Sequence, residues 1–356
     1  MSGAGNFGAA SGEALRGMRW RLTACALGVA LLGSGLAVQA DDATGKGDAA
    51  SGKQEAPAWS QKGVEARGPQ GPLKGTLMLH DKAGAPVVLI MPGSGPTNRD
   101  GNSPLGIRAA PYRLLAEGLA AKGIATLRID KRGMYESKQA IHNANAVTVE
   151  DYVQDLNAWV DVARKEMKAS CVWVLGHSEG GMIALDSAQT ASDSICGYIL
   201  VSTAGRPMGR IFADQLKANQ ANRPILDSAL KAIEKLEAGR RVGADELEPA
   251  LRPAFGQEVQ GFMISAFKRD PVKLIAGVKK PTLIVQGEED IQVPASEAKL
   301  LQQAQPDARL LMLPGMNHVL KAVKPKDMQD NLRAYNQPKR PLAPGLVDGI
   351  AEFVSK

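Results

Sequence analysis

A serine flanked by glycines follows directly after an apolar run. The segment GHSEG at residues 176–180 fits the pattern G-x-S-x-G, and residues 172–175 before it have the composition of a buried strand. Between a strand and a helix this pattern makes a sharp turn that holds the serine hydroxyl out at the carboxyl end of the strand. Gly176 and Gly180 leave room for that turn. Ser178 is therefore predicted to be a nucleophile, with the positive end of the following helix dipole beside it.

A serine hydroxyl is a weak nucleophile until a base accepts its proton, so the histidines are the next candidates. The sequence has four: His80, His142, His177 and His318. His177 adjoins the serine, where its side chain should point away from the serine oxygen. His80 and His142 fall in an early turn and in a loop. His318 follows an apolar run, on a loop at the carboxyl edge of the expected sheet, and is the predicted base.

A carboxylate should hold the imidazole and stabilise its cation. Three acids, Glu288, Glu289 and Asp290, follow another apolar run. We expect Asp290 to orient His318, with Glu289 as the alternative. The chain order Ser178, Asp290, His318 is the one that this strand–turn–helix arrangement imposes.

The negative charge that develops on an attacked carbonyl needs two backbone donors. One is the amide of Glu179, the residue after the nucleophile. The other is expected in PGSGPTNRDGN at 92–102, where we choose the amide of Ser94 because Gly93 and Gly95 let the backbone approach a substrate. Two roles remain open for the side chain of Glu179: contact with substrate, or an ion pair with a nearby arginine.

Short apolar runs alternate with helical patterns from about residue 60 onward. This alternation predicts an α/β fold, with a mostly parallel central sheet and helices on both faces. A hairpin is expected between the runs 75–79 and 86–91, and a helix over 148–167 opened by Thr148. Strand signals vanish from about 202 to 281, which predicts a helical cap over one end of the sheet.

The first 40 residues have the pattern of a secretory signal. Three arginines precede an uncharged apolar stretch at 22–40 that ends in Val38-Gln39-Ala40, which predicts cleavage after Ala40 and a periplasmic or secreted protein. Met18 is an alternative start. The same stretch could instead stay as a membrane anchor, since about 20 apolar residues span a bilayer.

These patterns divide the chain into consecutive segments. They are a signal peptide at 1–40, a flexible lead-in at 41–58, the first part of the core at 59–205, the helical cap at 206–280 and the second part of the core at 281–356.

Two cysteines remain after the predicted cleavage. Cys171 and Cys196 each stand at the start of an apolar run. If these runs are neighbouring parallel strands, both sulfurs lie at the same end of the sheet. In an oxidising compartment they would then form a disulfide, and two free thiols are the alternative.

Composition argues against several other classes of function. Aromatic residues make up 4% of the chain, and the lysines and arginines behind the net charge of +6 are scattered, so no nucleic-acid partner is expected. No histidine, cysteine or acidic cluster has metal-ligand spacing, and no phosphate-binding glycine motif with lysine occurs. The sequence predicts no metal and no cofactor. A membrane contact is expected only through an uncleaved N-terminus.

Taken together, PGSGPTNRDGN, LRIDKRGMYES, GHSEGG, GEEDIQVP and GMNH resemble the α/β-hydrolase-fold serine hydrolases over residues 60–356, and in particular a bacterial esterase subgroup of the serine aminopeptidase-like hydrolases. The resemblance implies the same triad and oxyanion position. It also implies that Asp130 and Arg132 lie near the oxyanion loop for structural reasons. Two positions depart from the family pattern: Pro92 precedes Gly93 where His-Gly is common, and Tyr135 replaces a glycine.

These features predict a hydrolase of small-molecule carboxylic esters with short to medium acyl chains, acting through an acyl-enzyme on Ser178. Phe262, Met263, Ile264 and Phe267 in the cap are candidates for the wall of an acyl pocket. A serine aminopeptidase is the main alternative and needs a cap carboxylate, for which the candidates are Glu234, Glu237, Glu246 and Glu248. A thioesterase and a non-catalytic binding protein are the remaining alternatives, and the oligomeric state is left open.

Overall fold

The computed structural model describes residues 59–80, 84–190 and 192–356. The predicted signal peptide at 1–40, with its cleavage site, and the lead-in at 41–58 lie outside the described residues. No helix in the described ranges is long and apolar enough to cross a bilayer.

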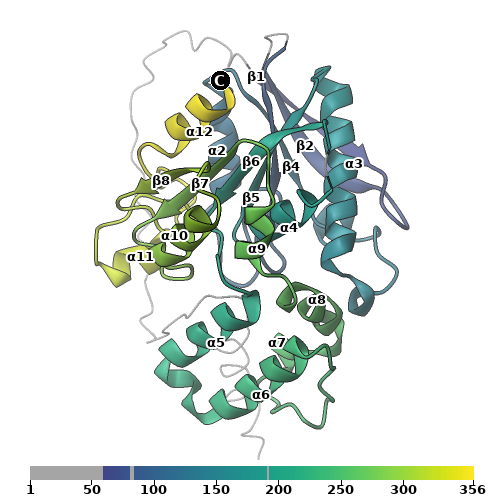
Figure 1. Cartoon of the computed structure of the whole chain (residues 1–356), viewed down its shortest axis with the longest axis vertical. Helices are drawn as coiled ribbons and strands as arrows, with labels where there is room; N and C mark the ends of the chain where they lie inside the picture. The colour runs from purple at the N-terminus through teal and green to yellow at the C-terminus, as the bar shows by residue number, and fades with distance from the viewer. Residues whose placement is uncertain (1–58, 81–83, 191) are drawn as a thin grey trace, which may run out of the picture.

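An eight-stranded sheet forms the centre of the fold (Figure 1). Its strands are β1 (Trp59–Ala66), β2 (Leu73–His80), β3 (Val87–Met91), β4 (Ala125–Ile129), β5 (Val172–His177), β6 (Ile195–Val201), β7 (Thr282–Gly287) and β8 (Arg309–Leu313). Their spatial order is β1-β2-β4-β3-β5-β6-β7-β8. The pairs β1–β2 and β2–β4 are antiparallel, and the neighbours from β4 to β8 are parallel. The predicted mostly parallel sheet is confirmed.

The expected hairpin between 75–79 and 86–91 is wrong. β2 instead pairs with β1 along its whole length and with β4 on its other side, while β3 lies between β4 and β5. The five residues of β3 are all buried, which suits a strand covered on both faces in the middle of a sheet. β1 exposes most of its residues and closes the edge.

Helices cover both faces of the sheet. The helices that precede β6 or follow β7 are α2 (Pro111–Ala120), α3 (Val149–Met167), α4 (Glu179–Ser187), α10 (Ala295–Ala304), α11 (Met328–Ala334) and α12 (Leu346–Val354), with short 3₁₀ turns η1 (Tyr135–Ser137) and η2 (Ala144–Ala146). α2 and α12 share a core with Val88 and Ile90 of β3, while α3, α4 and α10 share one with Leu89 and Met91. Figure 1 shows α2 and α12 on one side of the sheet and α3 on the other. Alternate side chains of one strand thus fill two separate cores.

The start of α3 follows from its sequence. The hydroxyl of Thr148 accepts a hydrogen bond from the amide of Asp151, and the Asp151 carboxylate accepts one from the amide of Thr148. This capping box satisfies amides that the first helical turn leaves without partners. Leu156 and Val160 of this helix are buried.

Between β6 and β7 the chain is helical. This segment contains α5 (Met208–Ala218), η3 (Gln220–Ile225), α6 (Leu226–Glu237), α7 (Arg252–Phe255), α8 (Gln257–Phe267) and α9 (Pro271–Ala276). Figure 1 shows α5 to α8 gathered beyond one end of the sheet, whereas α9 packs back against α4 and α10. We call residues 206–280 the cap.

Cys171 and Cys196 are joined by a disulfide. The two residues lie where the parallel neighbours β5 and β6 begin. The disulfide therefore lies at the amino ends of these strands, whereas Ser178 lies at the carboxyl end of β5.

Candidate active site

Ser178 stands on a strained turn between β5 and α4. Its backbone has φ 54° and ψ −118°, a combination that costs energy for any residue with a side chain and is found mainly at functional sites. A Cβ atom at Gly176 would overlap the backbone of Gly180, and one at Gly180 would overlap the carbonyls of Met91 and Pro92. The two glycines therefore allow both the turn and its close approach to the loop after β3.

The structure places Asp290, and not Glu289, against His318. The Nδ1 atom of His318 lies 2.8 Å from Oδ2 of Asp290. The other carboxylate oxygen accepts the amides of Gln292 at 2.8 Å and Val293 at 2.9 Å. Glu289 instead accepts the amide of Lys326. Burial raises the pKa of the Asp290 carboxyl, but His318 and these amides outweigh it and hold the pKa below its ordinary value.

Ser178 and His318 line one cavity at the carboxyl edge of the sheet, together with Gly93 and Ser94. In the described part of the chain no hydrogen bond joins the serine hydroxyl to the imidazole. Such bonds are often long without substrate and shorten in the reacting complex. The structure therefore brings the three predicted triad residues to one place, with His318 and Asp290 already paired.

Both expected oxyanion donors lie beside the serine. Ser94, Ser178 and Glu179 line a second cavity beneath the cap. Within the described ranges, the amides of Ser94 and Glu179 donate no hydrogen bond to the protein. Two such amides next to a nucleophile can bind the oxygen of an attacked carbonyl.

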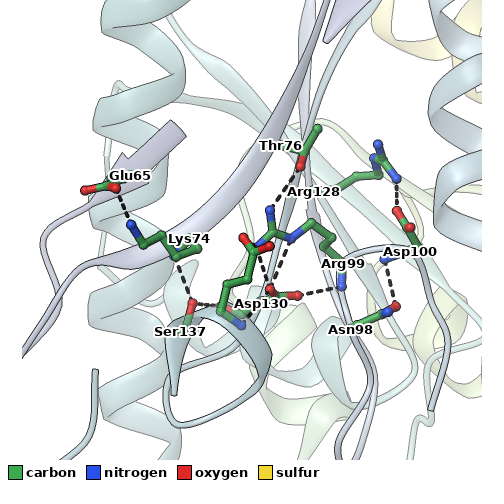
Figure 2. A network of polar contacts seen from close by, with 10 residues as sticks. Glu65, Lys74, Thr76, Asn98, Arg99, Asp100, Arg128, Asp130 and Ser137 are labelled. Carbon is green, nitrogen blue, oxygen red and sulfur yellow. Dashed lines mark hydrogen bonds and ion pairs between the residues drawn. The ribbon is translucent and has the colours of Figure 1, made fainter. Parts of the chain in front are cut away.

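The loop that carries Ser94 is held in place by Asp130 (Figure 2). The carboxylate of Asp130 accepts the amide of Arg99 at 2.9 Å and also binds its guanidinium. Arg99 in turn reaches Thr76 on β2, and the Asp130 carbonyl accepts the hydroxyl of Ser137. The predicted structural role of Asp130 near this loop agrees with these contacts.

The guanidinium of Arg132 binds two acids. It binds Asp155 at 2.7 Å and Asp151 at 2.7 Å, both on α3. Arg132 thus anchors the segment after β4 to a helix. It also lines one cavity together with Ser94, Gly95 and Pro96, so its place near the oxyanion loop and its structural role agree with the expectation.

Tyr135, where the family pattern has a glycine, has φ 46°. Its hydroxyl donates to the carbonyl of Pro96 on the oxyanion loop. The tyrosine therefore accepts a left-handed backbone and adds a contact to the loop that a glycine cannot make.

His177 joins the oxyanion loop to the loop of the base. Its Nε2 lies 2.9 Å from the carbonyl oxygen of His318, which can only accept, so Nε2 carries the hydrogen. Its Nδ1 then accepts from the hydroxyl of Tyr112 at 2.8 Å, and that oxygen accepts the amide of Gly93 at 3.1 Å. Burial, together with the nearby His318, lowers the pKa of His177 to about 3.

This buried neutral imidazole should destabilise the protein in acid. Below pH 6.5 the unfolded chain takes up a proton at His177, and the folded chain does so only near pH 3. The free energy of unfolding should therefore fall by about 1.4 kcal/mol per pH unit through this window because of this residue.

We expect His177→Gln to remove that part of the slope in urea titrations from pH 7 to 4. His142→Gln, at an exposed histidine, is the matched control and should keep the slope. Equal slopes in all three proteins would contradict the expectation.

Glu179 pairs with a lysine rather than an arginine. The Nζ atom of Lys131 donates to Oε1 of Glu179 at 2.9 Å and to the carbonyl of Gly93 at 2.8 Å. Their side chains are only 1% and 4% exposed. Sequence reasoning missed Lys131, although its place two residues after the buried strand β4, in RIDKRG, was a usable signal.

A larger cavity extends from Ser94 and Glu179 under the cap and has a volume of about 390 Å³. Its walls are mainly apolar and include Phe212 of α5 and Phe262 and Met263 of α8. Ile264 and Phe267, also expected in the wall, pack against the core instead.

Comparison with known proteins agrees with this geometry. The family model described as serine aminopeptidase, S33, matches residues 106–322, which include Ser178, Asp290 and His318. Esterase EstD of Thermotoga maritima is 25% identical over 241 residues, 66% of this chain; the match spans 54% of EstD, about half of its length. The 2-(acetamidomethylene)succinate hydrolase of Mesorhizobium japonicum is 22% identical over 267 residues, covering 70% of this chain and 88% of that protein.

Solved structures show the same fold. Est1E from Butyrivibrio proteoclasticus superposes with a TM-score of 0.50 at 18% identity, covering 83% of this chain and 99% of Est1E. A thermophilic esterase from Thermogutta terrifontis gives the same TM-score and identity, with 83% and 98% covered. Since the family model matches more than half of the chain, this protein belongs to the S33 serine aminopeptidase family of α/β-hydrolase-fold enzymes.

Proposed function

We propose that this hydrolase cleaves carboxylic esters through an acyl-enzyme on Ser178. One observation carries the proposal: Ser178 has a strained backbone and lines the same cavity as His318. Asp290 already orients that histidine. In the described residues the amides of Ser94 and Glu179 beside it donate to no protein group, so they can bind an oxyanion. The esterase EstD relative supports ester over other acyl substrates.

The proposed reaction has two halves. The Oγ of Ser178 bonds to the ester carbonyl carbon while Nε2 of His318 takes its proton, and Asp290 stabilises the resulting imidazolium. The two amides hold the oxyanion. Its collapse breaks the bond to the alkoxy oxygen, which leaves as the alcohol with the proton from His318. Water then attacks the acyl-enzyme by the same route and releases the acid.

The cavity under the cap supports a medium acyl chain or an aromatic acyl group. Its 390 Å³ is more than twice the volume of about 150 Å³ that suffices for benzene in an engineered protein cavity. Mostly apolar walls favour an acyl chain over a charged group.

An aminopeptidase is the second candidate. None of the four predicted cap carboxylates lines the described cavities beside Ser178; Glu237 contacts Arg210, and Glu246 binds Lys235. Glu258, at the start of α8, does line the large cavity, which favours amine recognition.

A substrate panel tests the proposal. Turnover of p-nitrophenyl esters from acetyl to palmitoyl should peak at a short to medium chain, and an acyl thioester and an aminoacyl p-nitroanilide should react much more slowly. Cleavage of the anilide alone, lost in Glu258→Gln, would establish the peptidase instead. No turnover of any of these substrates would favour a non-catalytic binding protein.

The site of the acyl chain is tested by filling the cavity. Ala254 lines it from α7, so Ala254→Phe should lower kcat/KM for the longest good substrate by about 10–100-fold and affect the acetyl ester much less. Ala221→Phe, at an exposed position of η3 in the same cap, is the matched control. If both variants keep the same chain-length profile as the native protein, the acyl chain does not occupy this cavity.

We also propose that the protein works in the periplasm or outside the cell. The disulfide between Cys171 and Cys196 supports this location, because such bonds persist in oxidising compartments. Sequencing the N-terminus of the purified native protein should find Asp41 as the first residue. A protein that still contains residues 22–40 would favour a membrane anchor.

A further inference from the structure

Lys131 has no task in the proposed reaction, although it is among the most completely buried charged groups near the site. Its side chain is 1% exposed, and the residue lies two positions after the end of β4. Its ammonium group touches two acceptors, the carbonyl oxygen of Gly93 and the carboxylate of Glu179. A third neighbour, the ring of Tyr152, lies 5.4 Å away.

The first acceptor belongs to the peptide group that carries an oxyanion donor. The carbonyl of Gly93 and the amide of Ser94 are parts of one planar peptide, in which C=O and N–H point in opposite directions. A donor that holds the carbonyl oxygen therefore fixes the direction of the Ser94 N–H. The amide of Gly93, on the other side of the residue, is bound by Tyr112, so the loop is held at both peptide groups.

The second acceptor belongs to the residue with the other donor. Glu179 supplies its own amide at the start of α4, and Lys131 binds its side chain. One ammonium group thus connects the loop after β3 with the turn after β5. It also neutralises a buried carboxylate that would otherwise repel the negative charge developing on the substrate oxygen.

We propose that Lys131 and Glu179 are positioning residues that set the oxyanion site, Lys131 by orienting the Gly93–Ser94 peptide and Glu179 by tying Lys131 to the nucleophile turn. The inference rests on the proposed acyl-transfer function. A purely structural ion pair is the competing explanation, and the two differ in what a neutral replacement does. Buried ion pairs can often be replaced by apolar side chains without loss of stability.

Three variants separate the explanations. Lys131→Met removes the donor and leaves a buried carboxylate. Lys131→Met with Glu179→Met removes both charges and keeps the volume. Glu179→Gln keeps an acceptor for Lys131 and does not remove the hydrogen bond from Lys131 to the Gly93 carbonyl. Arg269→Met with Asp186→Leu, at an ion pair toward the end of α4 outside the described cavities, is the matched control.

Each variant is compared by kcat and KM on the best p-nitrophenyl ester, by thermal unfolding, and by inhibition with two probes. A medium-chain trifluoromethyl ketone bonds to Ser178 and carries an oxyanion, whereas the alcohol of the same chain length binds without one. We expect both Lys131 variants to lose about 10²–10³-fold in kcat, with KM little changed, and to lose ketone inhibition in parallel. Alcohol inhibition should change less than about threefold. Glu179→Gln should lose about tenfold or less in kcat.

Two results would overturn the inference. One is a double variant that regains both native unfolding temperature and native kcat, which would make the pair structural only. The other is a Lys131→Met protein with native kcat and native ketone inhibition. If Lys131→Met does not fold, the neutral double variant still decides. Failure of the proposed function is recognised separately with Ser178→Ala on the same ester. If that variant retains activity, the proposed nucleophile is wrong, whatever the Lys131 and Glu179 variants show.

Discussion

Replacing Ser178 with alanine is expected to lower kcat for ester hydrolysis by about 10⁴–10⁶-fold. The variant loses the only atom that forms the acyl-enzyme, while the cavities, the Asp290–His318 pair and the free amides stay in place. A small rate above that in water should remain, because oxyanion binding and substrate positioning do not need the nucleophile. The measurement is single-turnover and steady-state hydrolysis of the best p-nitrophenyl ester.

Ser187→Ala is the matched control for this variant. Ser187 lies at the end of the same helix, is buried, and donates its hydroxyl to the carbonyl of Ala184, so its loss should not change turnover. A fluorophosphonate probe should add its mass to the native protein and to this control, and not to the Ser178→Ala protein. Full activity or full labelling after loss of Ser178 would refute the proposed nucleophile.

Asp290→Asn is expected to lower kcat by about 10⁴-fold with little effect on folding. The amide oxygen of the new side chain can still accept the amides of Gln292 and Val293, as Oδ1 of Asp290 does. Its NH₂ group then faces Nδ1 of His318 and donates to it. The imidazole must carry its hydrogen on Nε2 instead, and it can no longer take the proton of Ser178.

Glu289→Gln distinguishes this effect from a general loss of negative charge. Glu289 is adjacent in sequence, but its carboxylate binds the amide of Lys326 and does not face His318. We expect near-native kcat in Glu289→Gln. The nitrogen that carries the imidazole hydrogen can be assigned by ¹⁵N NMR of labelled histidine. A large loss in Glu289→Gln together with a small loss in Asp290→Asn would reverse the assignment of the acid.

Much of this site could be predicted because its signals are local. The turn at Ser178 is encoded by a strand pattern, two glycines and a helix within a dozen residues, and each of these depends on short-range sterics. The position of His318 followed from there being few histidines and from its place after a strand. Asp290 was the first choice from the sequence, and the structure excluded the alternative Glu289, since adjacent carboxylates in a loop look alike in sequence.

Other features depended on contacts between distant segments. β1 rather than β3 pairs with β2, because the sheet is ordered by which strand can be buried on both faces and which can close an edge. The bonds of His177 to Tyr112 and to the His318 carbonyl span 65 and 141 residues. The partner of Glu179 proved to be Lys131, 48 residues away.

The sequence by itself therefore determined the alternation of strands and helices, the serine turn, the order of the triad and the presence of a helical insertion. Those features follow from periodicity and turn chemistry, which act within a few residues. Only the tertiary structure decided which strand forms the edge, which acid meets His318, and how Lys131 connects the two oxyanion segments. A buried charge or hydrogen-bonding group must find a partner, and the sequence does not show which distant group the folded chain brings within reach.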